Sequence, residues 1–375
     1  MRIYPLLLCL FIPCKLIAQQ NYSRDVLKQI EEVENNLTGW TKIEGVKPWT
    51  LAERMKQHTT RGMSIAVIKD YKVEWVKNYG WADSAEQRPV TNTTIFQSGS
   101  ISKSLNAVGV LKLVQDGKLD LHTDINQYLK SWKFPYDSVS KGKKITIANL
   151  LSHSGGLSIH GFPGYERGDT IPVLSQVLNG LSPANTKAVR SEFEPSLKFQ
   201  YSGGGTTISQ VIVQDITGLP YDEYMWKNVL QPLGMTSSTY SQPPKKEAHL
   251  IATGYFSDGP VKSKYHVYPE QAAAGLWSNT SDLAKFVIET QLALEGRSGK
   301  VLSPSTAQLM LTPYVDEAAA LGTFILQRGT VKYFTHNGQD AGFVAKYIGS
   351  MQGGNGAVIM VNYDNGAIME EIVNS

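Results

Sequence analysis

The sequence predicts an α/β protein in which helices flank an antiparallel sheet and an all-helical lobe lies beside that sheet. Three observations lead to this prediction. Alternating and β-branched segments occur early in the chain, at about residues 60–99, and return late, at about residues 320–363. Helical patterns separated by Gly-, Ser- and Pro-rich loops fill the middle, and those at about 100–235 form the predicted lobe. One sheet built from both ends of the chain fits this order.

Each strand is predicted from its local pattern. Residues 62–68 are apolar and β-branched, Asp70 and Tyr71 form a turn, and residues 72–79 alternate, which is typical of a hairpin. Residues 94–97 are a further short strand. The late strands are predicted at residues 323–327, 331–335, 342–348 and 357–362.

Helices are predicted where apolar residues recur every three or four positions. Residues 24–37 and 51–58 show this spacing before the first strand. From Ser100 the pattern is again helical, and it closes at Asp116 and Gly117. The remaining predicted helices are residues 147–151, 208–217, 221–229, 282–294, 304–311 and 367–373.

Charge restricts the choice of partners. The 375 residues include 36 Lys and Arg against 33 Asp and Glu, a formal net charge of +3. A balance so close to neutral gives no electrostatic reason to expect nucleic acid or an anionic membrane surface. The partner expected instead is a small-molecule or peptide substrate, and the protein is expected to be a monomer.

The first residues are typical of a secretory signal peptide. Arg2 is followed by the apolar residues 5–17, and Ala18 precedes a polar stretch. We expect cleavage after Ala18, an N-terminal helical segment at residues 19–44, and one domain at residues 45–375. The protein would then be exported, either periplasmic or secreted. A buried N-terminal strand is the alternative for this segment.

Both cysteines, Cys9 and Cys14, lie in the predicted signal peptide. The mature chain is therefore expected to have no disulfide and no cysteine nucleophile. Lipid attachment at Cys14 is a second reading of the same segment. No later segment has the length and apolarity of a membrane helix.

Ser100 to Lys103 form an S-x-x-K sequence where a predicted strand passes into a helix. Residues three apart share a helix face, so the Lys103 amine can reach the Ser100 hydroxyl. A serine hydroxyl needs an adjacent base, and a lysine kept neutral by burial and neighbouring positive charge can serve. N–H groups at the helix start would face a reacting carbonyl. Such a pair also arises by chance on solvated helix faces.

Two further motifs follow along the chain. Tyr201 precedes Ser202 and the glycines at 203–205, which favours a tight loop that presents the phenol to a ligand; a surface turn with an aromatic plug is the alternative. His336 and Gly338 follow a predicted strand. Glycine there allows close backbone approach, and His336 supplies a donor or a switchable charge. A histidine with its hydrogen bonds satisfied inside the protein is the alternative.

Together and in this order, the three motifs resemble those of the serine β-lactamase and penicillin-binding protein superfamily. By pattern the nearest relatives are class C-like β-lactamases, D-peptidases and family VIII-type esterases. Similarity runs from about residue 45 to the end and includes residues 96–103 (FQSGSISK), 150–157 (LLSHSGGL), 231–240 (QPLGMTSSTY) and 274–277 (AGLW). The resemblance implies the β-lactamase/transpeptidase-like fold, with a catalytic domain at 45–375 and an active site between sheet and lobe. It implies no cofactor and no metal.

The resemblance also implies a role for each site residue. Ser100 would be acylated, and Lys103 would assist removal of its proton. Tyr201 would act as general acid and base toward the leaving group and the hydrolytic water. The backbone N–H groups of Ser100 and Gln339 would form the oxyanion hole. His153 is expected to be a structural hydrogen-bonding residue. The substrate-binding residues would be His336, Asn337 and Gly338.

Two departures from the superfamily pattern bear on the substrate. Gly203 stands where β-lactamases commonly have an asparagine that contacts the substrate amide, and His336 stands where they have lysine. Both changes disfavour efficient β-lactam hydrolysis. We therefore expect a serine hydrolase that acts through an acyl-enzyme on a carboxylic ester, a β-lactam or a D-amino-acid peptide, with an ester or D-peptide favoured.

The sequence also bears on other classes of protein. The chain has no G-x-S-x-G and no H-E-x-x-H sequence, which argues against an α/β-hydrolase and a zinc enzyme. The alternative from another class is a non-catalytic protein of the same fold that binds penicillin or cell-wall peptides.

Overall fold

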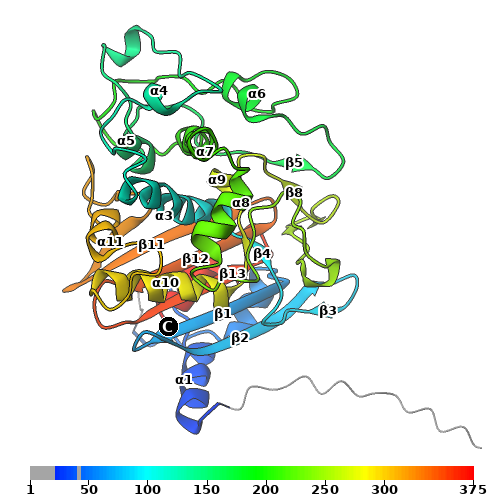
Figure 1. The fold of residues 1–375 in the computed structure, drawn as a ribbon. Coiled ribbons are helices and arrows are strands. Elements are labelled where there is room, and N and C mark those ends of the chain that lie inside the picture. The colour runs from blue at the N-terminus through cyan, green and yellow to red at the C-terminus, as the bar shows by residue number, and fades with distance from the viewer. Residues whose placement is uncertain (1–21, 40–43) are drawn as a thin grey trace, which may run out of the picture.

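A seven-stranded antiparallel sheet forms the lower half of the molecule (Figure 1). The computed structural model describes residues 22–39 and 44–375, so the predicted signal peptide lies outside the described residues. The strand order is β10-β11-β12-β13-β1-β2-β3. Their bounds are β1 Gly62–Lys69, β2 Lys72–Asp83, β3 Arg88–Pro89, β10 Phe324–Arg328, β11 Val331–Asp340, β12 Phe343–Ser350 and β13 Gly356–Val361.

The two ends of the chain meet at the centre of this sheet. Strand β13 lies between β12 and β1, and Ile65 of β1 is opposite Ile359 of β13. The late strands therefore complete a sheet that the early hairpin begins. This arrangement confirms the fold class that the sequence predicts.

Helices cover both faces of the sheet. On one face α1 (Arg24–Asn35), α2 (Leu51–Gln57) and α12 (Ala367–Val373) share an apolar cluster with Ile65 and Ile359. On the other face α10 (Thr280–Leu294) packs against β1, β12 and β13. There the Ser64 and Thr280 hydroxyls are 2.7 Å apart. Alternation along β1 sends Met63 and Ile65 to the first face and Ser64 to the second, as the pleat requires.

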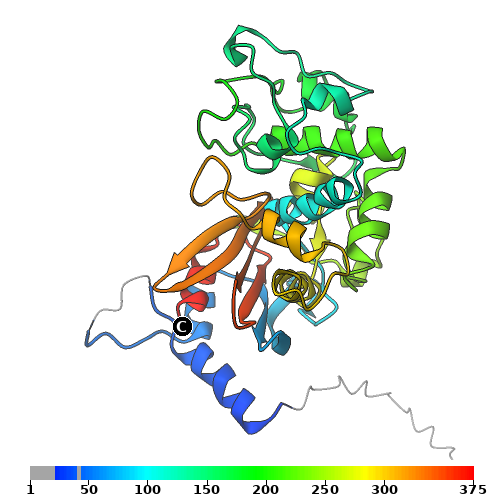
Figure 2. The same ribbon diagram turned by 60° about the vertical axis from the view of Figure 1, so that its left-hand side comes forward.

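The helical lobe lies above the sheet, and α3 (Ser102–Gln115) lies between them (Figures 1 and 2). Most of α3 is buried, because both the lobe and the sheet side of the molecule pack against it. The helices of the lobe are α4 Ile125–Tyr128, α5 Ile147–Leu151, α6 Leu174–Asn179, α7 Gly203–Thr217 and α8 Tyr221–Met225, with one π-helical turn at Trp226–Leu230. After the lobe, the chain forms α9 (Gln271–Ala274), then α10, and then α11 (Pro304–Met310) before it enters the late strands.

The structure corrects two local expectations. The glycines at 203–205 form the first turn of α7 rather than a tight loop. They are needed because a Cβ on Gly204 would lie 2.9 Å from the Ser158 carbonyl oxygen. Strand β11 runs on to Asp340, so His336 lies within the strand and not after it. Pairing of β11 with β12 continues through Asp340 and Phe343 and holds these polar residues in extended form.

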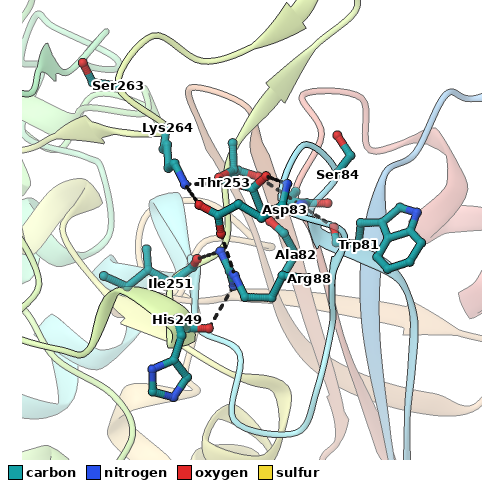
Figure 3. A network of polar contacts seen from close by, with 12 residues as sticks. Trp81, Ala82, Asp83, Ser84, Arg88, His249, Ile251, Thr253, Ser263 and Lys264 are labelled. Atoms are coloured by element: carbon teal, nitrogen blue, oxygen red, sulfur yellow. Dashed lines mark hydrogen bonds and ion pairs between the residues drawn. The ribbon is translucent and has the colours of Figure 1, made fainter.

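A buried aspartate and its polar partners fasten one loop region to the edge of the sheet (Figure 3). Asp83 at the end of β2 is 2% exposed and accepts hydrogen bonds from the Thr253 hydroxyl at 2.7 Å and the Lys264 amine at 2.9 Å. The Arg88 guanidinium donates to two backbone carbonyls of the same region at 2.9 and 2.8 Å. Burial by itself would raise the pKa of Asp83, but the donors of Thr253, Lys264 and the Glu86 N–H lower it to about 2. Residues 249–264 are thereby held against β2 and β3.

Among the residues that the structure describes, no helix combines the length and the apolarity needed to cross a bilayer.

Candidate active site

Ser100 and Lys103 lie one helical turn apart, where the chain passes from β4 (Phe96–Gln97) into α3. Ser100 is in a 3-10 turn, Gly99–Ile101, and Lys103 is in the first turn of α3. The Lys103 Nζ lies 2.9 Å from the Ser100 Oγ and donates to the Ala273 carbonyl oxygen at 2.7 Å. Lys103 is 3% exposed. Two short contacts therefore fix the amine beside the hydroxyl.

Strand β11 packs against this turn backbone to backbone. A Cβ on Gly338 would lie 1.9 Å from the Ser98 carbonyl oxygen, and a Cβ on Gly99 would lie 2.4 Å from the Gln339 nitrogen. Glycine is also required at 99 by its φ of +50°. Because no side chain separates the two segments, the backbone of Gln339 lies close to that of Ser100, and both residues line one pocket.

Tyr201 lies against Lys103 from the side of the lobe. Ser202 caps α7 through a hydrogen bond from the Gly205 N–H at 2.9 Å, which fixes the residue before the helix. The Lys103 Nζ is 5.0 Å from the centre of the Tyr201 ring, and the His153 ring is 4.2 Å from the same ring, centre to centre. The structure therefore brings Ser100, Lys103 and Tyr201 together.

His153 supports Tyr201 through its neighbour in the chain. Its Nδ1 accepts a hydrogen bond from the Ser202 N–H at 3.1 Å. Burial, followed by the charge of Lys103, lowers the pKa of His153 well below its usual range, so the ring is uncharged. In this geometry His153 is a hydrogen-bonding residue that holds the start of α7.

His336 approaches the site from β11 as a buried ring. It is 3% exposed, its Nδ1 is 2.6 Å from the Asn337 carbonyl oxygen, and its Nε2 has no hydrogen-bond partner. The Phe324 ring, which the sequence patterns did not single out, packs 5.2 Å from His336 and 6.5 Å from Tyr201. Burial, followed by the charge of Lys103, lowers the pKa of His336 to about 3. The expected switchable charge is therefore absent at neutral pH.

The side chain of Asn337 does not lie in the substrate-binding position that the resemblance implies. Its Oδ1 accepts a hydrogen bond from Lys346 at 3.0 Å, and Lys346 also donates to Glu370 of α12 at 2.7 Å. Successive residues of a strand point to opposite faces of the sheet. The Asn337 side chain therefore lies on the face covered by α12, opposite to His336. Only the backbone of Asn337 lies beside the site.

A pocket of about 500 Å³ opens at Ser100 and Lys103. Much of its lining is apolar or aromatic, and Phe162 and Phe256 are its largest apolar side chains. The Phe162 ring is so close to α7 that a Cβ on Gly203 would lie 2.9 Å from it. Phe162 thus occupies the space that an asparagine at position 203 would need. The other lining residues are Gly161, Pro163, His266, Tyr268, Ala273, Ala274, Gln339, Asp340, Ala341 and Asp364.

The comparison with known families decides the identity of this arrangement. The family model described as Beta-lactamase matches residues 50–371. The chain belongs to the β-lactamase family. This membership covers both halves of the sheet and the whole helical lobe, and so includes every residue of the S-x-x-K, tyrosine and histidine motifs.

Individual relatives of this β-lactamase family member are distant. Protein flp of Staphylococcus aureus (strain N315) is 28% identical over 233 residues, which are 60% of this chain and 44% of the relative. The chain therefore spans about half the length of the first curated relatives it matches. A Beta-lactamase of Pseudomonas fluorescens is 29% identical over 249 residues, covering 66% of this chain and 64% of the relative.

A solved structure shows the same fold. The crystal structure of a Beta-lactamase/D-Alanine Carboxypeptidase from Pseudomonas syringae superposes with a TM-score of 0.69 at 20% identity. The match covers 86% of this chain and 94% of that one. At this identity the likeness extends to the fold, and the chemistry has to be argued from the residues of this chain.

Two buried carboxyl groups in this β-lactamase fold were not foreseen from the sequence. Glu270, at the start of α9, is 0% exposed, and both of its carboxyl oxygens lack a partner. Burial raises the pKa of Glu270 to about 7. Asp340, at the end of β11, is 6% exposed, and burial raises its pKa well above the usual range. No local pattern marks them, because burial here depends on segments far apart in the chain.

No metal site accompanies these carboxyl groups in the described part of the chain, where no cluster of three or more His, Cys, Asp or Glu residues could hold a metal ion.

The buried state of His336 predicts a loss of stability in mild acid. In the unfolded chain a histidine takes up a proton as the pH falls through about 6.5. The folded protein does not protonate His336 until the pH nears 3. The unfolded state therefore binds more protons between these values, and the free energy of unfolding falls as the pH drops through that window. From this group alone, urea unfolding should show a loss of about 2 kcal/mol between pH 7.5 and pH 5.

The His336→Asn variant should lose that part of the pH dependence, whatever its stability at pH 7.5. His249, whose side chain is 64% exposed, provides the matched control. His249→Asn should keep the full dependence of the parent protein. An unchanged pH dependence in His336→Asn would show that this ring is accessible to protons in the folded protein.

Proposed function

We propose that this protein is an exported serine hydrolase that forms an acyl-enzyme on Ser100 and acts on carboxylic esters or D-amino-acid peptides. The observation that carries the proposal is the 2.9 Å contact between the Lys103 Nζ and the Ser100 Oγ at the mouth of a pocket. A serine beside a buried amine in this position has the geometry of an activated nucleophile. We also propose that the protein is a monomer. This part of the proposal and the proposed export rest on the sequence.

Acylation follows from the contacts of Lys103. In its amine form Lys103 takes the proton of the Ser100 hydroxyl while Oγ forms a bond to the substrate carbonyl carbon. The Ala273 carbonyl holds the nitrogen at 2.7 Å and so limits its motion during the transfer. The carbonyl oxygen gains negative charge, and the backbone N–H groups of Ser100 and Gln339 stabilise it.

Tyr201 takes part in release of the leaving group and in hydrolysis of the acyl-enzyme. Its hydroxyl gives a proton to the leaving alkoxide or amine as the bond between carbonyl carbon and leaving group breaks, and the Lys103 ammonium restores that proton. Water then attacks the acyl carbon, loses a proton to the same pair, and releases the acid as Ser100 recovers its hydrogen. Because Tyr201 lies beside Lys103, we place the leaving group on the Tyr201 side and the acyl group in the pocket at Ser100.

The lining of the pocket indicates the substrate. Phe162, Phe256 and Tyr268 present aromatic surface to the acyl group, and Gly203 provides no amide contact. The uncharged His336 provides no positive charge for a substrate carboxylate. These features favour an ester or peptide with an apolar acyl side chain over a β-lactam, whose carboxylate would lack an anchor.

The experiment is intact-mass measurement of the purified protein with a p-nitrophenyl ester of an aromatic acid and with a chromogenic cephalosporin, while product release is followed. We expect steady turnover of the ester and a transient adduct that maps to Ser100. A permanent cephalosporin adduct with no turnover of either compound would instead identify a binding protein of the same fold.

A further inference from the structure

The carbonyl that holds the Lys103 amine belongs to a segment far along the chain. Lys103 donates to the Ala273 carbonyl oxygen at 2.7 Å, and the two residues are 170 positions apart. Ala273 lies near the end of α9, and the chain continues through Leu276 into β9 (Trp277–Ser278). We call residues 273–276 the anchor segment. Because no covalent connection lies nearby, the place of the Ala273 carbonyl depends on the noncovalent contacts that fasten this segment to the nucleophile turn.

Leu276, at the end of the anchor segment, is held by both of its backbone groups. Its carbonyl oxygen accepts a hydrogen bond from the Ser98 N–H at 2.8 Å. Its N–H donates to the Ser102 hydroxyl oxygen at 2.9 Å, and the same hydroxyl donates to the Gly99 carbonyl oxygen at 2.6 Å. Ser102 is 0% exposed, so neither of its bonds competes with water. The Ser102 hydroxyl therefore ties the anchor segment to the residue that precedes the nucleophile.

The start of α9 is held near the same residue. The Ser102 carbonyl oxygen accepts a hydrogen bond from the Tyr240 hydroxyl at 2.7 Å. Gln271, the first residue of α9, donates through its side chain to the Tyr240 carbonyl oxygen at 2.8 Å. These contacts and the bond from the Leu276 N–H reach Ser102 from both ends of the stretch that contains Ala273. Loss of the Ser102 hydroxyl would leave Leu276 with one of these two bonds, and the Ala273 carbonyl would gain freedom to move.

We infer that Ser102 is a positioning residue: its hydroxyl fixes the anchor segment and thereby holds the Ala273 carbonyl, and with it the Lys103 amine, beside the nucleophile. The inference rests on the proposed acyl-enzyme function. Because Ser102 is fully buried and its hydroxyl hydrogen is engaged by the Gly99 carbonyl, it has no contact with substrate and transfers no proton. Its effect is expected in the rate of acylation, which needs the amine in place, and not in substrate binding.

The test compares Ser102→Ala with Ser102→Thr in single-turnover and steady-state hydrolysis of a p-nitrophenyl ester by the full chain. Alanine leaves the Leu276 N–H without its side-chain acceptor, and displacement of a catalytic group by about 1 Å costs on the order of 10²-fold in rate. We expect Ser102→Ala to lower the acylation rate by about 100-fold and to leave KM within about threefold. Ser102→Thr should restore the rate to within about fivefold of the parent, because threonine keeps the hydroxyl and can donate it to a carbonyl three residues earlier.

Ser104→Ala is the matched control. Ser104 lies on the same helix, is also 0% exposed, and its hydroxyl likewise has two partners, the Gly322 carbonyl oxygen at 2.7 Å and the Tyr347 hydroxyl at 2.8 Å. Neither partner belongs to the anchor segment. The urea midpoints of the two alanine variants should fall by similar amounts, whereas the acylation rate of Ser104→Ala should stay within about threefold of the parent. If Ser102→Ala does not fold, Ser102→Cys fills the same space with a weaker donor and acceptor, and a loss of at least about tenfold in acylation is expected.

The outcomes separate the inference from the function on which it rests. An unchanged acylation rate in a folded Ser102→Ala or Ser102→Cys variant, or equal losses in Ser102→Ala and Ser102→Thr, would overturn the role of Ser102 while the parent still hydrolyses the ester. A loss in Ser104→Ala as large as that in Ser102→Ala would overturn it as well, since it would reduce both effects to a general loosening of the helix. Failure of the proposed function would show earlier, as a parent protein without adduct or turnover.

Discussion

Ser100→Ala should abolish ester hydrolysis, with a loss in kcat of at least about 10⁴-fold relative to the parent protein. Without the hydroxyl there is no atom to form the acyl bond, and the Lys103 amine faces a methyl group. The remaining N–H groups and the pocket still bind the substrate, so its affinity should change little. Rates of p-nitrophenol release, with intact mass recorded in parallel, measure both the loss and the absence of an adduct.

Ser131→Ala is the control for this substitution. Ser131 is an exposed serine of the helical lobe, far along the chain from the nucleophile turn. Its replacement should leave kcat and the adduct unchanged. Retention of most activity in Ser100→Ala would end the assignment of Ser100 as the nucleophile.

Lys103→Gln should lower kcat by about 10³-fold while the fold is kept. Glutamine keeps a polar N–H donor on the side of the Ala273 carbonyl, which the Lys103 amine contacts at 2.7 Å, but it cannot take up the serine proton. Because that proton must leave as Oγ attacks, acylation itself should slow. Single-turnover kinetics with the p-nitrophenyl ester resolve this step from the later release of the acid.

The same helix provides the comparison for Lys103. Lys112 in the last turn of α3 forms an ion pair with Asp116, and its side chain is 27% exposed. Lys112→Gln removes the same charge from the same helix and should leave the acylation rate within about twofold. Similar losses in the two variants would mean that Lys103 contributes its charge to the stability of the helix and not a base to the reaction.

The sheet could be predicted because its signals are local. Alternation at residues 72–79 and β-branched residues at 62–68 indicate a hairpin from neighbouring residues alone. The same holds for Ser100 and Lys103, since a spacing of three residues places both on one helix face. The structure brings them to a 2.9 Å contact. Here the sequence pattern and the tertiary structure agree because both depend on the same helical turn.

Other features depend on partners that the local pattern does not contain. Residues 336–340 are polar and resemble a loop, yet pairing with β12 extends β11 through Asp340. Three consecutive glycines disfavour a helix, but the Ser202 cap and the close approach of the Ser158 backbone place them in one. The burial of Glu270 and Asp340 results from the packing of α9 and β11 near Tyr268. Only the three-dimensional structure could reveal these contacts.

The position of β13 between β12 and β1 has a consequence for how the protein acquires its fold. The ribosome makes β1 and β2 early, whereas residues 356–361, the second partner of β1, are made some 290 residues later. Until then the hairpin has an open edge with unpaired N–H and C=O groups that can pair with another chain. Because the contacts that close the sheet join such distant residues, folding is expected to be slow and to finish only after synthesis of the last strand. Nascent chains of this protein should therefore depend on chaperones that cover the edge of β1 during translation.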